Sequence, residues 1–154
     1  MPIKTFRGLM KDNDQDTIVL HTNDGSIGYK IKDLRLMPNK PGDSDYEFIC
    51  QVWKVEQAVN IPGGTDLFAK IDFSSQTLLA AATIEDFDTA AYIATTGQVI
   101  FDNEIFNQDI YVTMRDKNTG EDCNYYLELE QIKLDLNENT VATLKDIRNV
   151  TTPT

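Results

Sequence analysis

Three acidic side chains alternate near the start of the chain, at a spacing that matches the first ligands of an EF-hand calcium loop. Residues 11–18 read KDNDQDTI and place Asp12, Asp14 and Asp16 two residues apart. An EF-hand loop also needs Gly at its sixth position and a bidentate acid at its twelfth, but here these positions hold threonine and asparagine. We therefore interpret the segment as a polar corner between two strands and expect no metal. A looser calcium site is the alternative.

Histidine and cysteine are too sparse for the common metal and nucleophile sites. His21 is the one histidine of the chain. The two cysteines, Cys50 and Cys123, lack the spacing of zinc-finger ligands. No G-x-S-x-G elbow presents a serine to His21. We interpret His21 as a half-exposed strand residue and both cysteines as free thiols.

Four acids could supply a pair of carboxylates of the glycosidase type: Glu104, Asp109, Glu128 and Glu130. Such a pair is recognised by its separation in space, which a sequence does not give. Glu128 and Glu130 alternate with apolar residues, so exposure on the polar side of a sheet explains them. Gly63-Gly64 has no following Lys and reads as a flexible turn rather than a phosphate loop. We expect no catalytic residue, no cofactor and no enzyme activity.

Three aromatic residues could form a platform on which a sugar stacks: Trp53, Tyr125 and Tyr126. Alternation assigns Trp53 and Tyr125 to apolar sides of their strands, which favours packing in the core. Tyr126 shares the acidic side with Glu128. Tyr126 is therefore the predicted surface contact.

The elements that carry these residues have a period of two. Residues 17–22 and 27–37 alternate and flank Asn23-Asp24-Gly25, a tight-turn signal, so we predict a hairpin. Within the second strand the apolar parity changes between Ile31 and Leu34. That change predicts a bulge near Lys32-Asp33.

The remaining pattern gives further strands. Residues 46–57 carry apolar groups on both sides, which predicts a strand covered on both faces. Residues 77–84 fit a strand or a short buried helix, and a parity change in 124–136 predicts a second bulge near Glu130-Gln131. Two more strands are expected at 98–103 and 109–116, with loops at 38–45, 58–71 and 117–122 and an ambiguous excursion at 85–97.

The segment that follows the last predicted strand has the pattern of a helix. Asn137 or Asn139 is the predicted cap, and Val141, Leu144 and Ile147 line one face at spacings of three. The fold class is therefore all-β, an antiparallel β-sandwich that is jelly-roll-like, with a short C-terminal helix. We expect a single domain over residues 1–150 and a frayed tail over 151–154.

Charge limits the classes of partner. The chain of 154 residues has a formal charge of −11 and a pI of about 4.4, which disfavours nucleic acid. Residues 1–40 hold seven Lys or Arg against five Asp, a net of +2, so the remainder is strongly acidic. A basic partner surface or a neighbouring copy could recognise that asymmetry, although solubility also explains it. No stretch has the ~20 apolar residues of a membrane span, and no signal-peptide core is present, so we expect synthesis in a cytoplasm.

Three stretches resemble a known family. They are FRGLMKDNDQDTIVLHTNDGSIGYKI (6–31), FDNEIFNQDIYVT (101–113) and NYYLELEQIKLDLNENTVATLKDIRN (124–149). These are similar to small proteins of marine tailed bacteriophages, most of them described as hypothetical or virion structural. The resemblance implies a component of the virion and brings no catalytic residues with it.

The expected function is therefore that of a capsid decoration, or cement, subunit. Such a protein bridges the major capsid protein or other virion proteins, commonly as a homo-oligomer, for which we expect a trimer, and many weak contacts add through multivalency. Lys4, Arg7 and Lys11 in the less acidic segment are the predicted shell contact. The alternatives are a tail or neck component, or a carbohydrate-binding module on a fibre.

Overall fold

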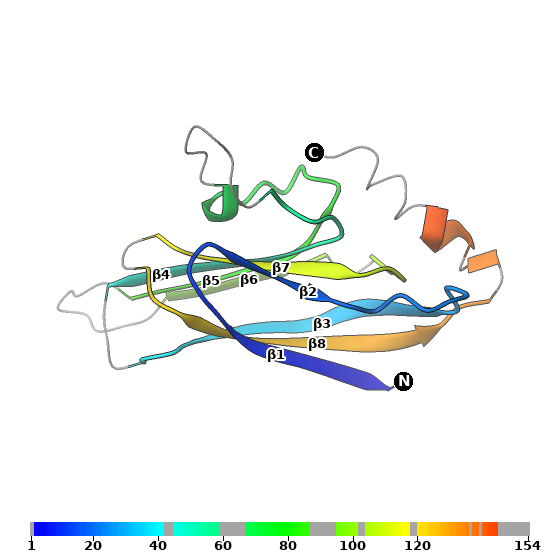
Figure 1. Cartoon of the computed structure of the whole chain (residues 1–154), viewed down its shortest axis with the longest axis horizontal. Helices are drawn as coiled ribbons and strands as arrows, with labels where there is room; N and C mark the ends of the chain where they lie inside the picture. Colours follow the sequence, from blue (N-terminus) through cyan, green and yellow to red (C-terminus); the bar gives the residue numbers. More distant parts are fainter. Residues whose placement is uncertain are drawn as a thin grey trace.

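A computed structural model shows two antiparallel sheets in two layers (Figure 1). It describes residues 2–41, 45–58, 67–86, 95–101, 104–117, 120–135, 137–138 and 140–144. The three-stranded sheet has the order β1 (Ile3–Met10), β8 (Cys123–Lys133), β3 (Ile27–Pro38). The five-stranded sheet has the order β2 (Asp14–Ile18), β7 (Ile110–Asp116), β4 (Tyr46–Trp53), β5 (Leu78–Asp86), β6 (Thr95–Ile100). A 3₁₀ turn, η1 (Leu67–Ala69), follows β4.

The order of the strands confirms the predicted jelly-roll-like sandwich. The chain changes sheet between β1 and β2, between β2 and β3, between β3 and β4, and again between β7 and β8. This places β1-β8-β3 opposite β2-β7-β4-β5, as in a jelly roll. The strand β6 pairs with β5 rather than with β3. Its Gln98 side chain nevertheless reaches β3, where it donates to the Leu34 carbonyl and to Asp33 Oδ1.

Both sheets contribute to one hydrophobic cluster between them. The three-stranded sheet buries Leu34, Leu127 and Leu129, whose inward direction follows from strand alternation. The five-stranded sheet supplies a larger set, including Phe48, Cys50, Val52, Ala80, Ala82, Ile84, Val112 and Met114.

The predicted bulge near Lys32-Asp33 is confirmed. The register of β3 on β8 shifts between Ile31, which pairs with Leu129, and Asp33, which pairs with Glu128. The extra residue lets Ile31 and Leu34 both face the core although they are three positions apart.

The second predicted bulge is wrong. The ladder between β8 and β3 runs without a shift through Glu130-Gln131. The apolar parity changes there because Leu134, just after β8, is buried on the other side of the sheet. A side chain on Gly28 would meet Ile105 and Leu134, so the segment around Ile105 covers this end of the sheet.

The predicted hairpin is also wrong. The strand β2 ends at Ile18 and pairs with β7, whereas β3 pairs with β8. Oδ1 of Asp109 accepts the backbone N–H groups of Leu20 (2.9 Å) and His21 (3.1 Å), so a side chain takes the donors that a ladder would use. Gly25, with φ of 67°, lies in the turn that sends the chain into the other sheet.

The prediction that the strand at 46–57 is covered on both faces is confirmed for β4. Ile49, Gln51 and Trp53 on its outer side are buried like the core residues. Gln51 Nε2 donates to the carbonyl oxygens of Phe68 (3.3 Å) and Lys70 (2.9 Å), so η1 and its neighbours cover this side. The segment predicted over 77–84 forms strand rather than helix from Leu78 onward, within β5.

A short helix lies at residues 137–138 and 140–144. Its cap is Asp135 rather than Asn137: Asp135 Oδ1 accepts the Glu138 N–H (2.7 Å), and Glu138 Oε1 accepts the Asp135 N–H (3.4 Å). The side with Val141 and Leu144 is exposed, and Asn107 instead holds the helix by donating to Thr143 Oγ1 (2.7 Å). Asn139, Ile147, most of the excursion at 85–97 and the tail at 151–154 lie outside the described residues.

Candidate functional site

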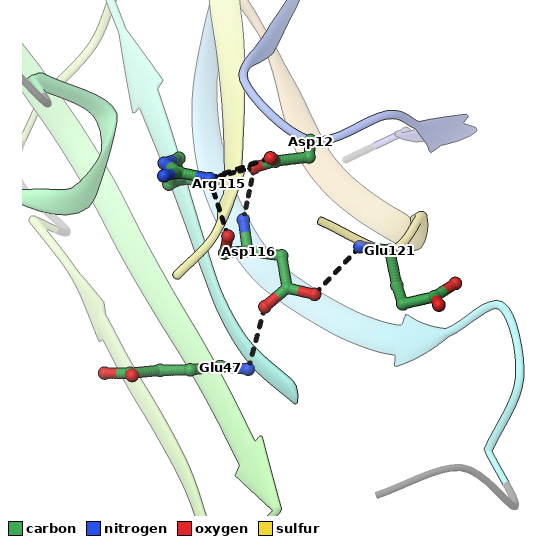
Figure 2. A network of polar contacts seen from close by, with 5 residues as sticks. All are labelled: Asp12, Glu47, Arg115, Asp116 and Glu121. Atoms are coloured by element: carbon green, nitrogen blue, oxygen red, sulfur yellow. Dashed lines mark hydrogen bonds and ion pairs between the residues drawn. The ribbon is translucent and has the colours of Figure 1, made fainter. Parts of the chain in front are cut away.

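The three aspartates of the opening segment bind three different partners. Both carboxylate oxygens of Asp12 lie 2.7 Å from Nη1 of Arg115 (Figure 2). Asp14 Oδ1 accepts the N–H of Gln15 (2.8 Å), and Asp16 Oδ2 accepts the hydroxyl of Tyr125 (3.4 Å). Within the described ranges, no group of three or more His, Cys, Asp or Glu side chains is placed to hold a metal.

The polar corner predicted over residues 11–18 is confined to residues 11–13, which take the chain from one sheet to the other. Asp14 and Asp16 lie instead in strand β2. Asn13 has φ of 60°, a conformation that asparagine tolerates better than most residues. Beyond Asp12, the network in Figure 2 centres on the buried Asp116, whose carboxylate accepts the N–H groups of Glu47 (3.2 Å) and Glu121 (2.9 Å). Through these bonds, Asp12 and Asp116 join the corner to β7 and β7 to β4.

Asp16 and Tyr125 change each other's acidity. Burial raises the pKa of Asp16, and the nearby Asp14 raises it further, against the opposing hydrogen bond from Tyr125. Burial, followed by the charge of Asp16, raises the pKa of Tyr125. Tyr125 therefore stays a neutral donor between the sheets, and its burial confirms the predicted core position.

The prediction that His21 is a strand residue is wrong, because β2 ends at Ile18 and His21 lies in the segment after it. Its side chain is half-exposed, as predicted. Its Nδ1 lies 2.7 Å from Asp109 Oδ1. Burial raises the pKa of Asp109, but the hydrogen bonds from the His21 ring and from the backbone of His21 and Leu20 outweigh it, so the pKa lies below its ordinary value. The contact between His21 and Asp109 fixes the segment that connects β2 and β3.

Both cysteines are free and buried. Burial raises the pKa of the Cys50 thiol, with a further contribution from Cys123. Burial likewise raises the pKa of Cys123 to about 12. The thiolate is the reactive form of cysteine, so these side chains pack as small apolar groups.

The four candidate carboxylates do not converge. Glu104 pairs with Lys54 (3.0 Å), Asp109 with His21, and Glu130 with Lys32 (3.7 Å). Glu128 lies on the side of the three-stranded sheet that faces away from the core. Trp53 is buried, as predicted, and its Nε1 donates to Thr113 Oγ1 (3.1 Å).

We call the side of the three-stranded sheet that faces away from the core the outer face. Tyr126 lies in the middle of the outer face and is exposed over 37% of its surface. It pairs with Arg7 on β1 and with Arg35 on β3, so one row across the sheet reads Arg–Tyr–Arg. The outer face consists of Thr5, Arg7, Leu9, Asp33, Arg35, Met37, Asn124, Tyr126 and Glu128. Most of these side chains line an open groove of about 910 Å³.

The three basic residues of the predicted shell contact do not share this face. Lys4 pairs with the buried Leu129 and therefore lies on the core side of β1, exposed at the end of the strand. Arg7 lies on the outer face, and Lys11 follows β1. The structure thus separates Lys4 from Arg7 and brings Arg7 beside Tyr126. Arg35 also lies on this face and was not among the predicted contacts, although the bulge at Lys32 sets the side of β3 that it faces.

A scan against protein-family models and a search of curated proteins find no match to the chain. In the part of the chain that the structure describes, no helix is long and apolar enough to cross a membrane.

Proposed function

We propose that this chain is a non-catalytic structural subunit of a bacteriophage particle, which decorates the shell and bridges neighbouring shell proteins. Jelly-roll sandwiches occur in viral capsid domains and in lectins, so the fold supports the proposal by analogy. The resemblance of residues 6–31, 101–113 and 124–149 to phage virion proteins supports it independently.

The observation that carries the proposal is the edge strand β1. One edge of β1 pairs with β8 over eight residues, and no described strand pairs with the other edge. An open edge presents unpaired backbone groups to a partner. Because Lys4 and Arg7 project to opposite sides of β1, a partner that meets the edge contacts both, and Lys11 extends the contact.

The charge of the chain supports the same orientation. Residues 1–40 carry a net of +2 in a chain of −11. An acidic shell surface would attract β1 and repel the rest of the subunit, which therefore faces water.

The test is the occupancy of this protein on purified particles, measured by quantitative mass spectrometry. Simultaneous Lys4→Glu, Arg7→Glu and Lys11→Glu changes should lower occupancy about tenfold, if each lost contact contributes roughly 0.5 kcal/mol. The matched control reverses three exposed lysines elsewhere, Lys40, Lys70 and Lys133, with the same change in net charge. Equal occupancy for both triple variants contradicts docking through β1.

Copy number separates the possible positions in the particle. A decoration subunit should be present at on the order of hundreds of copies, whereas a tail or neck ring has about a dozen or fewer. Absence of the protein from purified particles contradicts the proposed function itself.

A further inference from the structure

The groove on the outer face has the mixed lining of a ligand site. Leu9 and Met37 are at least half exposed beside Tyr126. Among the described residues, no hydrogen bond or ion pair engages the side chains of Arg7, Tyr126 and Glu128. Its volume of about 910 Å³ lies within the roughly 300–1,000 Å³ of small-molecule sites.

The lining is electrically neutral although the chain is strongly acidic. Arg7 and Arg35 supply two positive charges, and Asp33 and Glu128 supply two negative ones. Arg35 Nε lies 2.6 Å from Asp33 Oδ2, which leaves Arg7 and Glu128 as the two charges open to a ligand. A balanced site of this kind favours neither an anionic nor a cationic ligand.

The open groups supply donors, acceptors and a ring. The Arg7 guanidinium only donates, the Glu128 carboxylate only accepts, and the Asn124 amide does both. A ligand rich in hydroxyl groups matches this set because each hydroxyl both donates and accepts. The exposed ring of Tyr126 gives an apolar surface between them, on which the C–H face of a sugar can pack.

We propose that the outer-face groove binds a neutral oligosaccharide. One sugar ring packs on Tyr126, and its hydroxyl groups bond to Arg7, Asn124 and Glu128. This site is additional to the proposed function. It shares Arg7 with the shell contact, because Arg7 projects from β1 onto the outer face, whereas Asn124, Tyr126 and Glu128 lie on β8 and are not part of that contact.

The test begins with the purified full chain on an array of neutral and acidic oligosaccharides, followed by calorimetry with the best neutral oligosaccharide. Tyr126→Ala and Glu128→Gln should each weaken that binding at least about tenfold, as expected when a stacked ring or a charged hydrogen bond is lost. Tyr126→Phe, which keeps the ring, should retain most of the affinity. Phe73→Ala removes an exposed aromatic side chain outside the groove and is the matched control, with unchanged affinity expected.

Thermal unfolding of each variant shows whether it is folded, and Glu128→Gln still tests the site if Tyr126→Ala does not fold. No binding to any neutral oligosaccharide overturns the proposal. So does binding that Tyr126→Ala and Glu128→Gln leave unchanged, or binding restricted to acidic sugars. Particle occupancy is measured separately, so a chain that binds the sugar but is absent from particles contradicts only the structural role.

Discussion

One guanidinium nitrogen of Arg115 contacts both carboxylate oxygens of Asp12 at 2.7 Å, across 103 positions of the sequence. The same carboxylate accepts the N–H of Asp116 (2.8 Å). Three of the bonds that hold the corner between β1 and β2 against β7 therefore depend on a single side chain.

Replacing Asp12 should destabilise the fold without changing any response to calcium. Asp12→Ala removes the acceptor that Arg115 Nη1 and the Asp116 N–H share, while Arg115 keeps its bond to the Asp116 carbonyl oxygen, so we expect a loss of about 1–3 kcal/mol in unfolding free energy. Urea denaturation measures it. Asp14→Ala, which removes only a bond to the adjacent residue, is the control and should cost less.

A calcium-dependent rise in the melting temperature of the wild type, absent from Asp12→Ala, would contradict the structural role of Asp12. We expect both proteins to melt at the same temperature with excess calcium as with a chelator.

Asp109 should make stability fall in acid. Its folded pKa lies below the ordinary value of 3.8, so its contribution is complete above about pH 3.8 and is lost as the pH falls through the folded pKa. Asp109→Asn should be less stable than the wild type at neutral pH, and the difference should shrink below pH 3.8. Denaturation across the acid range measures it, and a constant difference would contradict the charge effect.

Asp16 should make stability change with pH in the opposite direction. Burial and Asp14 hold its folded pKa above 3.8, so ionisation costs stability once the pH rises through that folded pKa. Asp16→Asn should therefore be slightly more stable than the wild type at neutral pH and equal to it below pH 3.8. A loss at neutral pH would show that the bond from Tyr125 needs a charged acceptor.

The two thiols should react only when the chain opens. Cys50 and Cys123 are fully buried and their pKa values are raised, so a disulfide reagent should modify native protein at a rate that rises with denaturant. Val19→Cys, at a position exposed over 67% of its surface, should add one thiol that reacts at once. A rapid phase in the wild type would contradict this protection.

The side-chain amide of Gln98 should stabilise the fold by donating two hydrogen bonds from β6 to β3. Gln98→Ala removes the bonds to Asp33 Oδ1 (2.8 Å) and to the Leu34 carbonyl, and should cost about 1 kcal/mol. Gln98→Glu keeps the length but places a carboxylate against two acceptors, so it should cost more. Urea denaturation ranks the stabilities of the three proteins. A glutamate variant that is more stable than the alanine variant would contradict the two hydrogen bonds from Gln98 to β3.

Features set by neighbouring residues could be predicted from the sequence. The bulge in β3 follows from the parity of Ile31 and Leu34, and the exposure of Tyr126 follows from its alternation with Tyr125. Both depend on which side of a strand a residue faces, and that is a local property.

Features set by distant residues could not be predicted. The turn signal at Asn23-Asp24-Gly25 is real, but Asp109 decides that the flanking segments belong to different sheets. The placement of Arg7 and Arg35 beside Tyr126 depends on β8 lying between β1 and β3, and no residue of these strands signals that register. The bonds between Asp12 and Arg115 likewise cannot be predicted from a local sequence pattern, because the two residues are 103 positions apart.

The strands β1 and β3 share a single neighbour, β8, which the ribosome makes after every other described strand. Until β8 leaves the exit tunnel, neither has its native ladder, while β4, β5 and β7 can already pair. Such long-range pairing is slow, and unpaired strands expose a nascent polypeptide to aggregation. Newly made chains should therefore depend on a chaperone, and truncation before β8 should yield an insoluble product.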